Sequence, residues 1–444
     1  MTTAVVVGAG IGGICAAAAL RTACDEVVLV ERDLVSDDAV ARRGVPQANQ
    51  LHNLLTAAQV HIEEVLPGFI ERLLRAGAVR GEVSTDTHVF ELGLRMPERD
   101  LGLHLMCARR PVIEQVARTL AAESGVQVRD GLTATALDLR DDAVTGVTVR
   151  DRDGVVTHLR ADVVVDASGT GSLFERWLDD AGREVPIDTR TVAQWYTTTI
   201  FRLPEHLRGT RRFLLVFPTV PRSRGGLASP VDDDHIVVSV SGRGEDVPPT
   251  THDEFLRYAE TLEDPVIAEL VAACEPVSEP TTFRKMQATW RHYERMERPV
   301  AGLLPLGDAL ASLNPLFGQG MSVAAMQAAA LARLAAEDQQ RLTDVAKFTR
   351  RYLDAATEAV RAAWDLGNVV DPEAGLPPAF DEPANVAAIG ELLAEDADLH
   401  RTYVRVWHLL EPASVLDSPE LAARIDERRR AIESRDPADG HGHG

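Results

Sequence analysis

Lysine is almost absent from this chain of 444 residues, and aromatic side chains make up only 5% of it. Lys285 and Lys347 are the two lysines, so nearly all positive charge is carried by arginine. This scarcity excludes most catalytic schemes that depend on a lysine nucleophile. None of the four cysteines forms a CxxC pair, and their spacing matches no zinc site. We therefore expect free thiols in a reducing compartment and no bound metal.

Positive charge and long apolar runs are also scarce. The chain has 46 basic and 68 acidic residues, a formal net charge of −22. Such a surface repels phosphate backbones and anionic lipids, which excludes nucleic acid as an expected partner. The apolar run from Ala4 to Leu20 lacks the basic start of a signal peptide and is broken by glycines. We expect a cytoplasmic protein with no integral membrane segment.

The first informative motif is a glycine-rich turn near the N-terminus. A strand is predicted over 3–7, a helix over 11–22 and a second strand over 27–31, and the first turn has the spacing GxGxxG. Gly10 would let the backbone approach a pyrophosphate at the helix N-terminus, and Glu31 would accept hydrogen bonds from ribose hydroxyls. These features predict a dinucleotide site with the candidate residues Gly8, Gly10, Ile11, Gly12, Gly13, Glu31 and Arg32.

A second glycine-rich turn lies in the C-terminal half. Gly307 and Asp308 follow an apolar strand predicted over 302–306, and residues 314–321 open an alanine-rich helix predicted over 321–337. A carboxylate at a strand end can bind ribityl hydroxyls, and a glycine-rich helix start can direct N–H groups at an anionic flavin N1–C2=O. The candidates here are Gly307, Asp308, Pro315, Gly318, Gln319, Gly320 and Met321.

Several segments together resemble one enzyme family. The run from Pro305 to Ala324 is similar to the flavin-contacting segment of the FAD-dependent hydroxylases built like p-hydroxybenzoate hydroxylase. Other segments resemble the epoxidase-like branch of that family, which includes bacterial polyether epoxidases and is distantly similar to squalene epoxidase. These segments are Arg43 to Gln47 with Gln50 and His52, Arg110 to Glu114 (with Ile113 in place of the usual Leu), Val164 to Gly169, and Trp290 to Glu294. The similarity covers nearly the whole chain.

The resemblance implies an α/β fold. We expect a Rossmann-type FAD-binding domain assembled from discontinuous segments, an inserted and mainly antiparallel β-sheet substrate domain, and a C-terminal helical region. The strand-and-turn pattern between 192 and 240 agrees with such an insertion. The expected FAD-binding parts are 1–85, 105–185 and 286–345, with substrate-domain segments at 86–104 and 186–285, C-terminal helices at 346–433 and a disordered tail at 434–444.

The resemblance further implies an FAD-dependent monooxygenase. It would insert one oxygen atom from O2 into an apolar small molecule, a polyketide or terpenoid intermediate, through a flavin C4a-hydroperoxide. Arg43, Gln50 and Arg110 are candidate cofactor contacts, and His52 is expected to be structural. The expected reductant is NAD(P)H, used directly or through a partner flavin reductase, because Ser168 stands where aromatic hydroxylases carry an aspartate. The candidate substrate wall consists of Trp195, Tyr196, Phe213, Phe217 and Phe317.

Other functions remain open at this point. A flavin-dependent dehydrogenase or reductase, or a redox-neutral cyclase that uses FAD as a scaffold, would fit the same motifs. A flavin halogenase is disfavoured, because the chain lacks a WxWxIP motif and a suitably placed lysine. An NAD-sensing protein would leave the Gly307-Asp308 segment unexplained. Oxygen separates these functions, because only a monooxygenase leaves an O2-derived atom in its product.

Overall fold

The computed structural model describes residues 2–36, 38–42, 44–210, 212–219, 221–232, 234–337, 342–367 and 383–435. The chain divides into two compact units, one containing 1–78, 108–190 and 287–363 and the other 79–107, 191–286 and 364–444. Strands β13 (Ile187–Arg202) and β18 (Thr281–Arg291) and helix α9 (Val345–Gly367) pass from one unit into the other. The predicted α/β fold class, with discontinuous segments and an inserted sheet, is confirmed.

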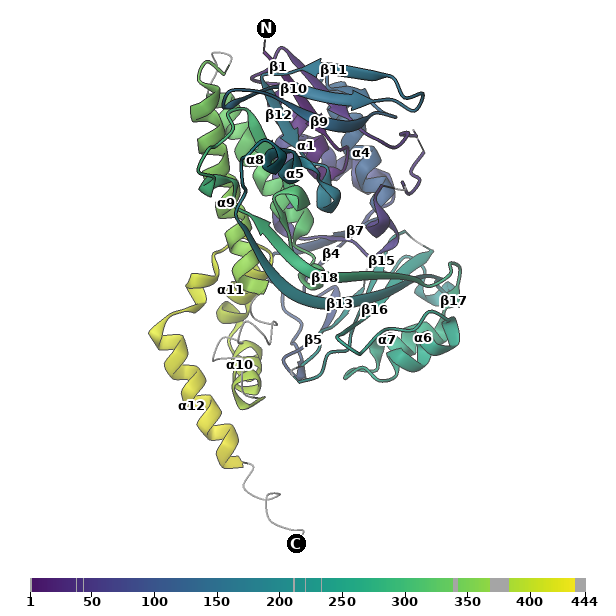
Figure 1. The fold of residues 1–444 in the computed structure, drawn as a ribbon. Helices are drawn as coiled ribbons and strands as arrows, with labels where there is room; N and C mark the ends of the chain where they lie inside the picture. The colour runs from purple at the N-terminus through teal and green to yellow at the C-terminus, as the bar shows by residue number, and fades with distance from the viewer. Residues whose placement is uncertain are drawn as a thin grey trace. The chain divides into compact units, whose positions relative to one another are not determined.

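A parallel sheet with the strand order β19-β12-β1-β2-β8 forms the core of the first unit (Figure 1). Its strands are β1 (Thr3–Val7), β2 (Glu26–Val30), β8 (Gln127–Arg129), β12 (Val163–Asp166) and β19 (Leu303–Pro305). The valine run of β12 is completely buried, as strands covered on both faces usually are. Helix α1 (Ile11–Leu20) lies against α4 (Arg110–Glu123) and α8 (Gly320–Glu337), so the two predicted glycine-rich helix starts belong to packed neighbours.

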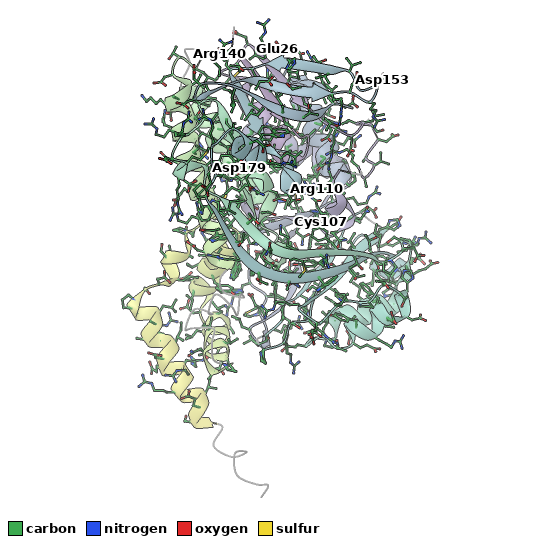
Figure 2. The ribbon with its side chains drawn as sticks, viewed as in Figure 1. Glu26, Cys107, Arg110, Arg140, Asp153 and Asp179 are labelled. Atoms are coloured by element: carbon green, nitrogen blue, oxygen red, sulfur yellow. The ribbon has the colours of Figure 1, made fainter. Side chains whose placement is uncertain are left out.

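The remaining elements of the first unit surround this sheet. An antiparallel sheet in the order β11-β10-β9 consists of β9 (Thr133–Arg140), β10 (Ala143–Arg150) and β11 (Val156–Arg160). The short strands are β3 (Asn53–Leu54) and β20 (Ala311–Ser312), and β20 pairs with the end of β18. The other helices are α2 (Thr56–Val65), α3 (Phe69–Arg75) and α5 (Phe174–Asp180). Figure 2 shows Arg140, at the end of β9, and Asp153, in the turn between β10 and β11, at opposite ends of this antiparallel sheet.

The second unit is built on a sheet in the order β18-β13-β16-β15-β14-β5-β6 (Figure 1). Its further strands are β5 (Thr87–Glu91), β6 (Leu94–Arg95), β14 (Phe213–Val216), β15 (Gly225–Pro230), β16 (His235–Arg243) and β17 (Glu275–Pro276), the last pairing with β13. Helices α6 (His252–Ala259) and α7 (Val266–Ala273) cover one face of the sheet. A Cβ atom on Gly226 would lie 2.7 Å from Ile267 Cδ1, so a larger residue in β15 would force the side chains of α7 to shift.

Three C-terminal helices pack near the edge of this sheet. They are α10 (Pro383–Glu395), α11 (Ala397–Trp407) and α12 (Pro419–Arg435), and they share an apolar cluster with β5 and β6. Strands β4 (Val79–Glu82) and β7 (His104–Cys107), which also belong to this unit, pair in antiparallel orientation. None of the described helices combines the length and apolar composition that crossing a bilayer requires.

Two sequence predictions of secondary structure are wrong in part. Residues 49–66 have a sequence pattern that predicts one continuous helix, but the helix begins only at Thr56, after a 3-10 turn at 46–49 and the short strand β3. Side chains satisfy the carbonyls of this segment instead: the His52 ring bonds to Gln50 O at 2.8 Å and Gln59 donates to Leu54 O at 2.9 Å. Of the tail expected to be disordered, residues 434 and 435 end α12, and 436–444 lie outside the described residues.

Glu91 accepts a hydrogen bond of 2.6 Å from the hydroxyl of Tyr403 beside the apolar cluster of the second unit. Burial raises the pKa of Glu91 from 4.5 to about 7, although the hydrogen bond from Tyr403 favours the charged form. Because the folded state holds the proton more tightly, this group's contribution to stability is complete below pH 4.5 and is lost as the pH rises through 7.

We therefore expect Glu91→Gln to be more stable, relative to the wild type, at pH 8 than at pH 5. Glutamine keeps a partner for Tyr403 but has no charge to bury, so the relative gain is on the order of 2 kcal/mol. Calorimetric unfolding of both proteins across this pH range measures the effect. A stability difference that does not change with pH would contradict the assignment.

Candidate functional site

The turn between β1 and α1 contains two kinds of glycine. At Gly8, Gly12 and Gly13 a Cβ would clash with the surrounding protein, whereas at Gly10 it would not. A Cβ on Gly13 would lie 1.9 Å from Gly8 O, and one on Gly12 would lie 2.7 Å from Leu306 Cδ2. Gly8 has a φ of 106°, and its Cβ would lie 2.4 Å from Ala167 O. Gly10 differs, because the nearest atoms to its Cβ are side-chain atoms at 3.9 and 4.0 Å. The protein leaves space beside Gly10, at the N-terminus of α1, where an anionic group fits.

Four buried charged side chains lie beside this turn. Arg42 bridges Glu31 and Glu114, with nitrogen–oxygen distances of 2.7 and 2.5 Å. Arg110 donates from Nε to the second oxygen of Glu114 at 2.8 Å. Burial opposes the charge on Glu114, but Arg110 and Arg42 outweigh it and lower the pKa of this carboxyl. We call Glu31, Arg42, Arg110 and Glu114 the charge quartet; its two cations and two anions balance.

The charge quartet also fixes the turn itself. Glu31 accepts hydrogen bonds from the backbone of Ala9 at 2.9 Å and of Asp33 at 3.0 Å, and Arg42 donates to Ala9 O at 2.8 Å. Arg110, the residue labelled in Figure 2, begins α4 and is only 9% exposed. The atom of Arg110 nearest to Gly10 is Nη2, 4.0 Å from the position of a Cβ. A ligand beside Gly10 would therefore contact this arginine.

A cavity of about 360 Å³ opens between the loop after β2 and helix α4. Its wall combines the cations Arg42, Arg118 and Arg152 with acidic residues, among them Asp33 and Asp38, and with apolar side chains such as Leu34 and Val40. The predicted contact Arg32 is exposed and donates to Gly44 O at 3.1 Å, so it braces this loop. Arg43, another candidate cofactor contact, lies outside the described residues. The cavity adjoins the charge quartet through Arg42 and Glu114.

The second predicted turn lies between β19 and α8. Gly307 and Asp308 form a short 3-10 turn, and the backbone N–H of Gly307 donates to Gln327 Oε1 of α8 at 2.7 Å. Pro315 starts another 3-10 turn, which ends at Gly318 with a φ of 64°. Gly320 begins α8, and apart from its chain neighbours and the backbone of α8 no atom of the described residues lies within 4 Å of the position of its Cβ. Like Gly10, it is a glycine at a helix N-terminus beside open space.

The two turns belong to packed neighbours. Besides its approach to Leu306, a Cβ on Gly12 would lie 3.2 Å from Ala324 Cβ, so α1 and α8 are in close contact near their first turns. Ile11 and Met321, the residues after the open glycines, are 3% and 8% exposed, and Gln319 is 2% exposed. The structure therefore brings together the two sets of candidates that the sequence places some 300 residues apart. An elongated ligand with an anionic middle fits this arrangement.

The loop residues Gln50 and His52 lie close to the charge quartet. Burial and the positive charge of Arg110 lower the pKa of His52 to about 3, so the ring is neutral at physiological pH. Its bond to Gln50 O orders the loop. This geometry supports the structural role expected for His52, since a ring that stays neutral does not act as an acid at physiological pH.

Ser168, which stands where aromatic hydroxylases carry an aspartate, is hydrogen-bonded to Asp166 at the end of β12. Both its backbone N–H and its hydroxyl donate to Asp166 Oδ1, at 3.1 and 2.6 Å, and Ser172 donates to Oδ2 at 2.5 Å. Burial raises the pKa of Asp166 despite these bonds. Ser168 thus orders the chain after β12.

The five residues of the candidate substrate wall lie on different faces and different elements of the structure. Strand β13 alternates its side chains, which places Trp195 and Tyr196 on opposite faces of the sheet. Tyr196 shares its face with Phe213 and Phe217, whereas Trp195 donates to Gly244 O at 3.2 Å and contacts the guanidinium of Arg284. Phe317 belongs to the first unit, next to the open start of α8. Trp195 and Tyr196 therefore cannot line one face together.

Two members of the charge quartet were not identified as site residues in the sequence. Glu114 stood in the helix-start motif without a role, and Arg42 was overlooked beside Arg43. The signal that could have identified Glu114 is its spacing from Arg110, one helical turn away on the same helix face. Nothing local marks Arg42, because its partners lie 11 and 72 residues away along the chain.

Comparison with known proteins agrees with this geometry. Residues 4–370 match the family of FAD dependent oxidoreductases. A relative from Mycobacterium tuberculosis, Protein Rv3254, is 29% identical over 387 residues, which are 83% of this chain and 80% of the relative. The flavin-dependent brominase Bmp2 shares the fold, with a TM-score of 0.68, 17% identity and coverage of 98% of this chain and 99% of that one. The anhydrotetracycline hydroxylase OxyS of Streptomyces rimosus gives a TM-score of 0.62 at 18% identity, covering 92% and 76%.

The residues around the two turns fit FAD. The open glycines at the starts of α1 and α8 place no side chain where a pyrophosphate and a flavin ring would approach, and Asp308 follows β19. The family match spans most of the chain, including both turns. The protein thus belongs to the FAD-dependent oxidoreductase family and is an FAD-dependent oxidoreductase.

Proposed function

We propose that the protein is a monooxygenase that places one oxygen atom from O2 into a small apolar substrate. The observation that carries this proposal is the pairing of the two open helix N-termini at Gly10 and Gly320. It supports an FAD that extends from the first turn to the second, as the resemblance of residues 305–324 to the hydroxylases implies. The hydroxylase among the structural neighbours has the same fold, which is compatible with the proposal.

In this proposal the protein binds and orients, and the bound FAD supplies the oxygen chemistry. The N-terminus of α1 would hold the pyrophosphate, with Arg110 as the nearest cation. The N-terminus of α8 would stabilise negative charge on the flavin ring, and Asp308 would accept hydrogen bonds from the ribityl hydroxyls. Glu31 would bind the ribose while it fixes the glycine turn. The apolar face of the second unit that carries Phe213 and Phe217 would exclude water from the substrate.

Isotope labelling tests the proposed reaction. The purified protein should show flavin absorption bands; it is then reduced with NADPH, NADH or a separate flavin reductase and exposed to ¹⁸O2 with polyketide and terpenoid candidates. One ¹⁸O atom in a product, with none from labelled water, is the expected result. A product without label would mean a dehydrogenase or a redox-neutral enzyme. Oxidation of NADPH without added reductase would show direct reduction, despite the serine at 168.

Asp308→Ala should weaken FAD binding roughly 10- to 100-fold, because a carboxylate accepting ribityl hydroxyls makes charge-assisted hydrogen bonds. Fluorescence titration of FAD into the unloaded protein measures the dissociation constant. Asp179→Ala, which removes an exposed carboxylate of α5 in the same unit, is the control and should bind FAD normally. Unchanged affinity in Asp308→Ala would refute the ribityl role.

A further inference from the structure

Gln327 is a polar side chain on the buried side of α8. It is 0% exposed, and its Oε1 accepts a hydrogen bond from the N–H of Gly307 at 2.7 Å. Ala324, almost one helical turn earlier, has its Cβ 3.6 Å from the position of a Cβ on Gly307, so the turn after β19 rests on this side of the helix. A buried amide group costs free energy unless it is hydrogen-bonded, and the contact with Gly307 offsets part of this cost.

The backbone before Asp308 is also held by other elements. The carbonyl of Pro305 accepts a hydrogen bond from the hydroxyl of Tyr352 in α9 at 2.9 Å, and Tyr352 is 0% exposed. The N–H of Leu306 donates to Asp166 O at 2.8 Å. Together with the bond from α8, these contacts fix three successive residues immediately before Asp308. The position of its carboxylate therefore depends on contacts from α8, α9 and β12.

Gln327 links two parts of the site that the flavin end of FAD would contact. Its helix begins at Gly320, about two turns earlier, which places the two residues on the same side of α8. Gly307 directly precedes Asp308, the proposed acceptor for the ribityl hydroxyls. One hydrogen bond therefore connects the turn that carries this carboxylate to the helix whose N-terminus would face the flavin ring. A displacement of about 1 Å is enough to impair a site of this kind.

We propose that Gln327 is a positioning residue that holds Asp308 at the distance from the start of α8 that FAD requires. This inference rests on the proposed ribityl role of Asp308 and extends it, because Gln327 acts through that carboxylate and does not contact the cofactor. Gln327→Met would keep the length of the side chain and remove the acceptor oxygen, so the turn would lose its bond to α8. Asp308 would then occupy a wider range of positions, and ordering it on binding would cost affinity.

The affinities for FAD and for ADP test this role. ADP contains the adenosine and the pyrophosphate of FAD but neither its ribityl chain nor its flavin ring. Titration calorimetry of the unloaded full-length chain gives both dissociation constants. We expect Gln327→Met to weaken FAD binding about tenfold, as the loss of one well-placed hydrogen bond does, and to leave ADP binding unchanged. Unchanged FAD affinity, or equal weakening of both ligands, would overturn the proposal.

A double-substitution cycle shows whether Gln327 acts through Asp308. In the Asp308→Ala background, Gln327→Met should weaken FAD binding by less than about twofold, because the carboxylate that it positions is already absent. A further loss of about tenfold would mean that Gln327 acts by another route, and would overturn the proposal.

The same cycle separates this inference from the claims beneath it. Unchanged affinity in Asp308→Ala alone would refute the ribityl role and this inference with it. A loss there without a loss in Gln327→Met would refute this inference alone. None of these measurements includes turnover, so they do not depend on the isotope experiment.

Thr349→Val is the matched control in the same unit. Thr349 is 3% exposed, and its Oγ1 accepts a hydrogen bond from the N–H of Gly302 at 2.8 Å. The substitution removes a bond of the same kind as Gln327→Met does, but at the residue before β19 rather than at Gly307. We expect a lower Tm and normal FAD affinity. A loss of FAD affinity as large as in Gln327→Met would show that loosening this part of the sheet is enough, and would overturn the specific role of Gln327.

Discussion

Replacing Gly10 by valine is expected to give a folded, colourless protein. The φ and ψ of Gly10 are −77° and 176°, which any residue adopts, and the nearest atoms to a Cβ are side-chain atoms 3.9 Å away. Valine therefore meets little in the protein itself, but its methyl groups would occupy the space left for the pyrophosphate. We expect FAD affinity to fall more than 100-fold, since the anion would lose the helix N-terminus. The absorption spectrum after purification with excess FAD measures the loading.

Gly12→Ala is the matched variant, and it is expected to destabilise the fold, whereas Gly10→Val is expected to block FAD binding. Its Cβ would lie 2.7 Å from Leu306 Cδ2 and 3.2 Å from Ala324 Cβ, so it overpacks the contact between α1 and α8. Overpacking costs about 1–3 kcal/mol, and we expect a lower Tm with and without FAD. Gly10→Val should unfold like the wild type when both lack FAD. Normal flavin loading in Gly10→Val would show that the pyrophosphate does not bind at this turn.

Glu114→Gln should destabilise the protein by about 3–5 kcal/mol, because it leaves two buried arginines without the carboxylate between them. Both Arg42 and Arg110 bond to Glu114, whose side chain is 4% exposed. Urea unfolding, with and without FAD, measures the loss. The pKa of Glu114 is lowered in the folded state, so its contribution is present above pH 4.5 and is lost as the pH falls through the lowered value. The difference between variant and wild type should therefore shrink in acid.

Glu123→Gln provides the control on the same helix. Glu123 pairs with Arg72 through two bonds of 2.7 Å, so its geometry is as good as that of Glu114, but the pair is exposed. Solvent screens such pairs, and little or no loss of stability is expected. Equal effects of the two substitutions would show that burial of the charge quartet does not matter.

Local patterns in the sequence predicted the parts of the fold that depend on local chemistry. The turn from β1 to α1 was predictable because its glycines, flanking strands and terminal Glu31 lie within one short segment. Strand β15 was not predicted, because two glycines and a proline make its sequence look like a turn. It forms nevertheless, since Gly226 lets α7 pack closely against the sheet.

The functional site likewise contains some residues that local sequence patterns identify and others that they do not. The carboxylate at Asp308 and the glycine-rich starts of α1 and α8 were recognisable by residue type and spacing. Arg42 was not, because its role comes from Glu114, a residue 72 positions away in sequence. Placing Trp195 and Tyr196 on one wall ignored the alternation of a strand, which the sequence pattern alone could have corrected.

Because the first unit is discontinuous in sequence, its parallel sheet cannot be completed until β19 has been synthesised. Strand β19 begins at Leu303, 137 residues after β12 ends at Asp166, and β12 forms its outer ladder with β19. At roughly 5–20 residues per second, a ribosome needs about 7–27 seconds to make that stretch. During this interval the valines of β12 have an unpaired edge, of the kind that recruits chaperones or foreign strands. Slow decoding between these strands would lengthen the exposure, so we expect the yield of native protein to depend on the translation rate in the middle of the message.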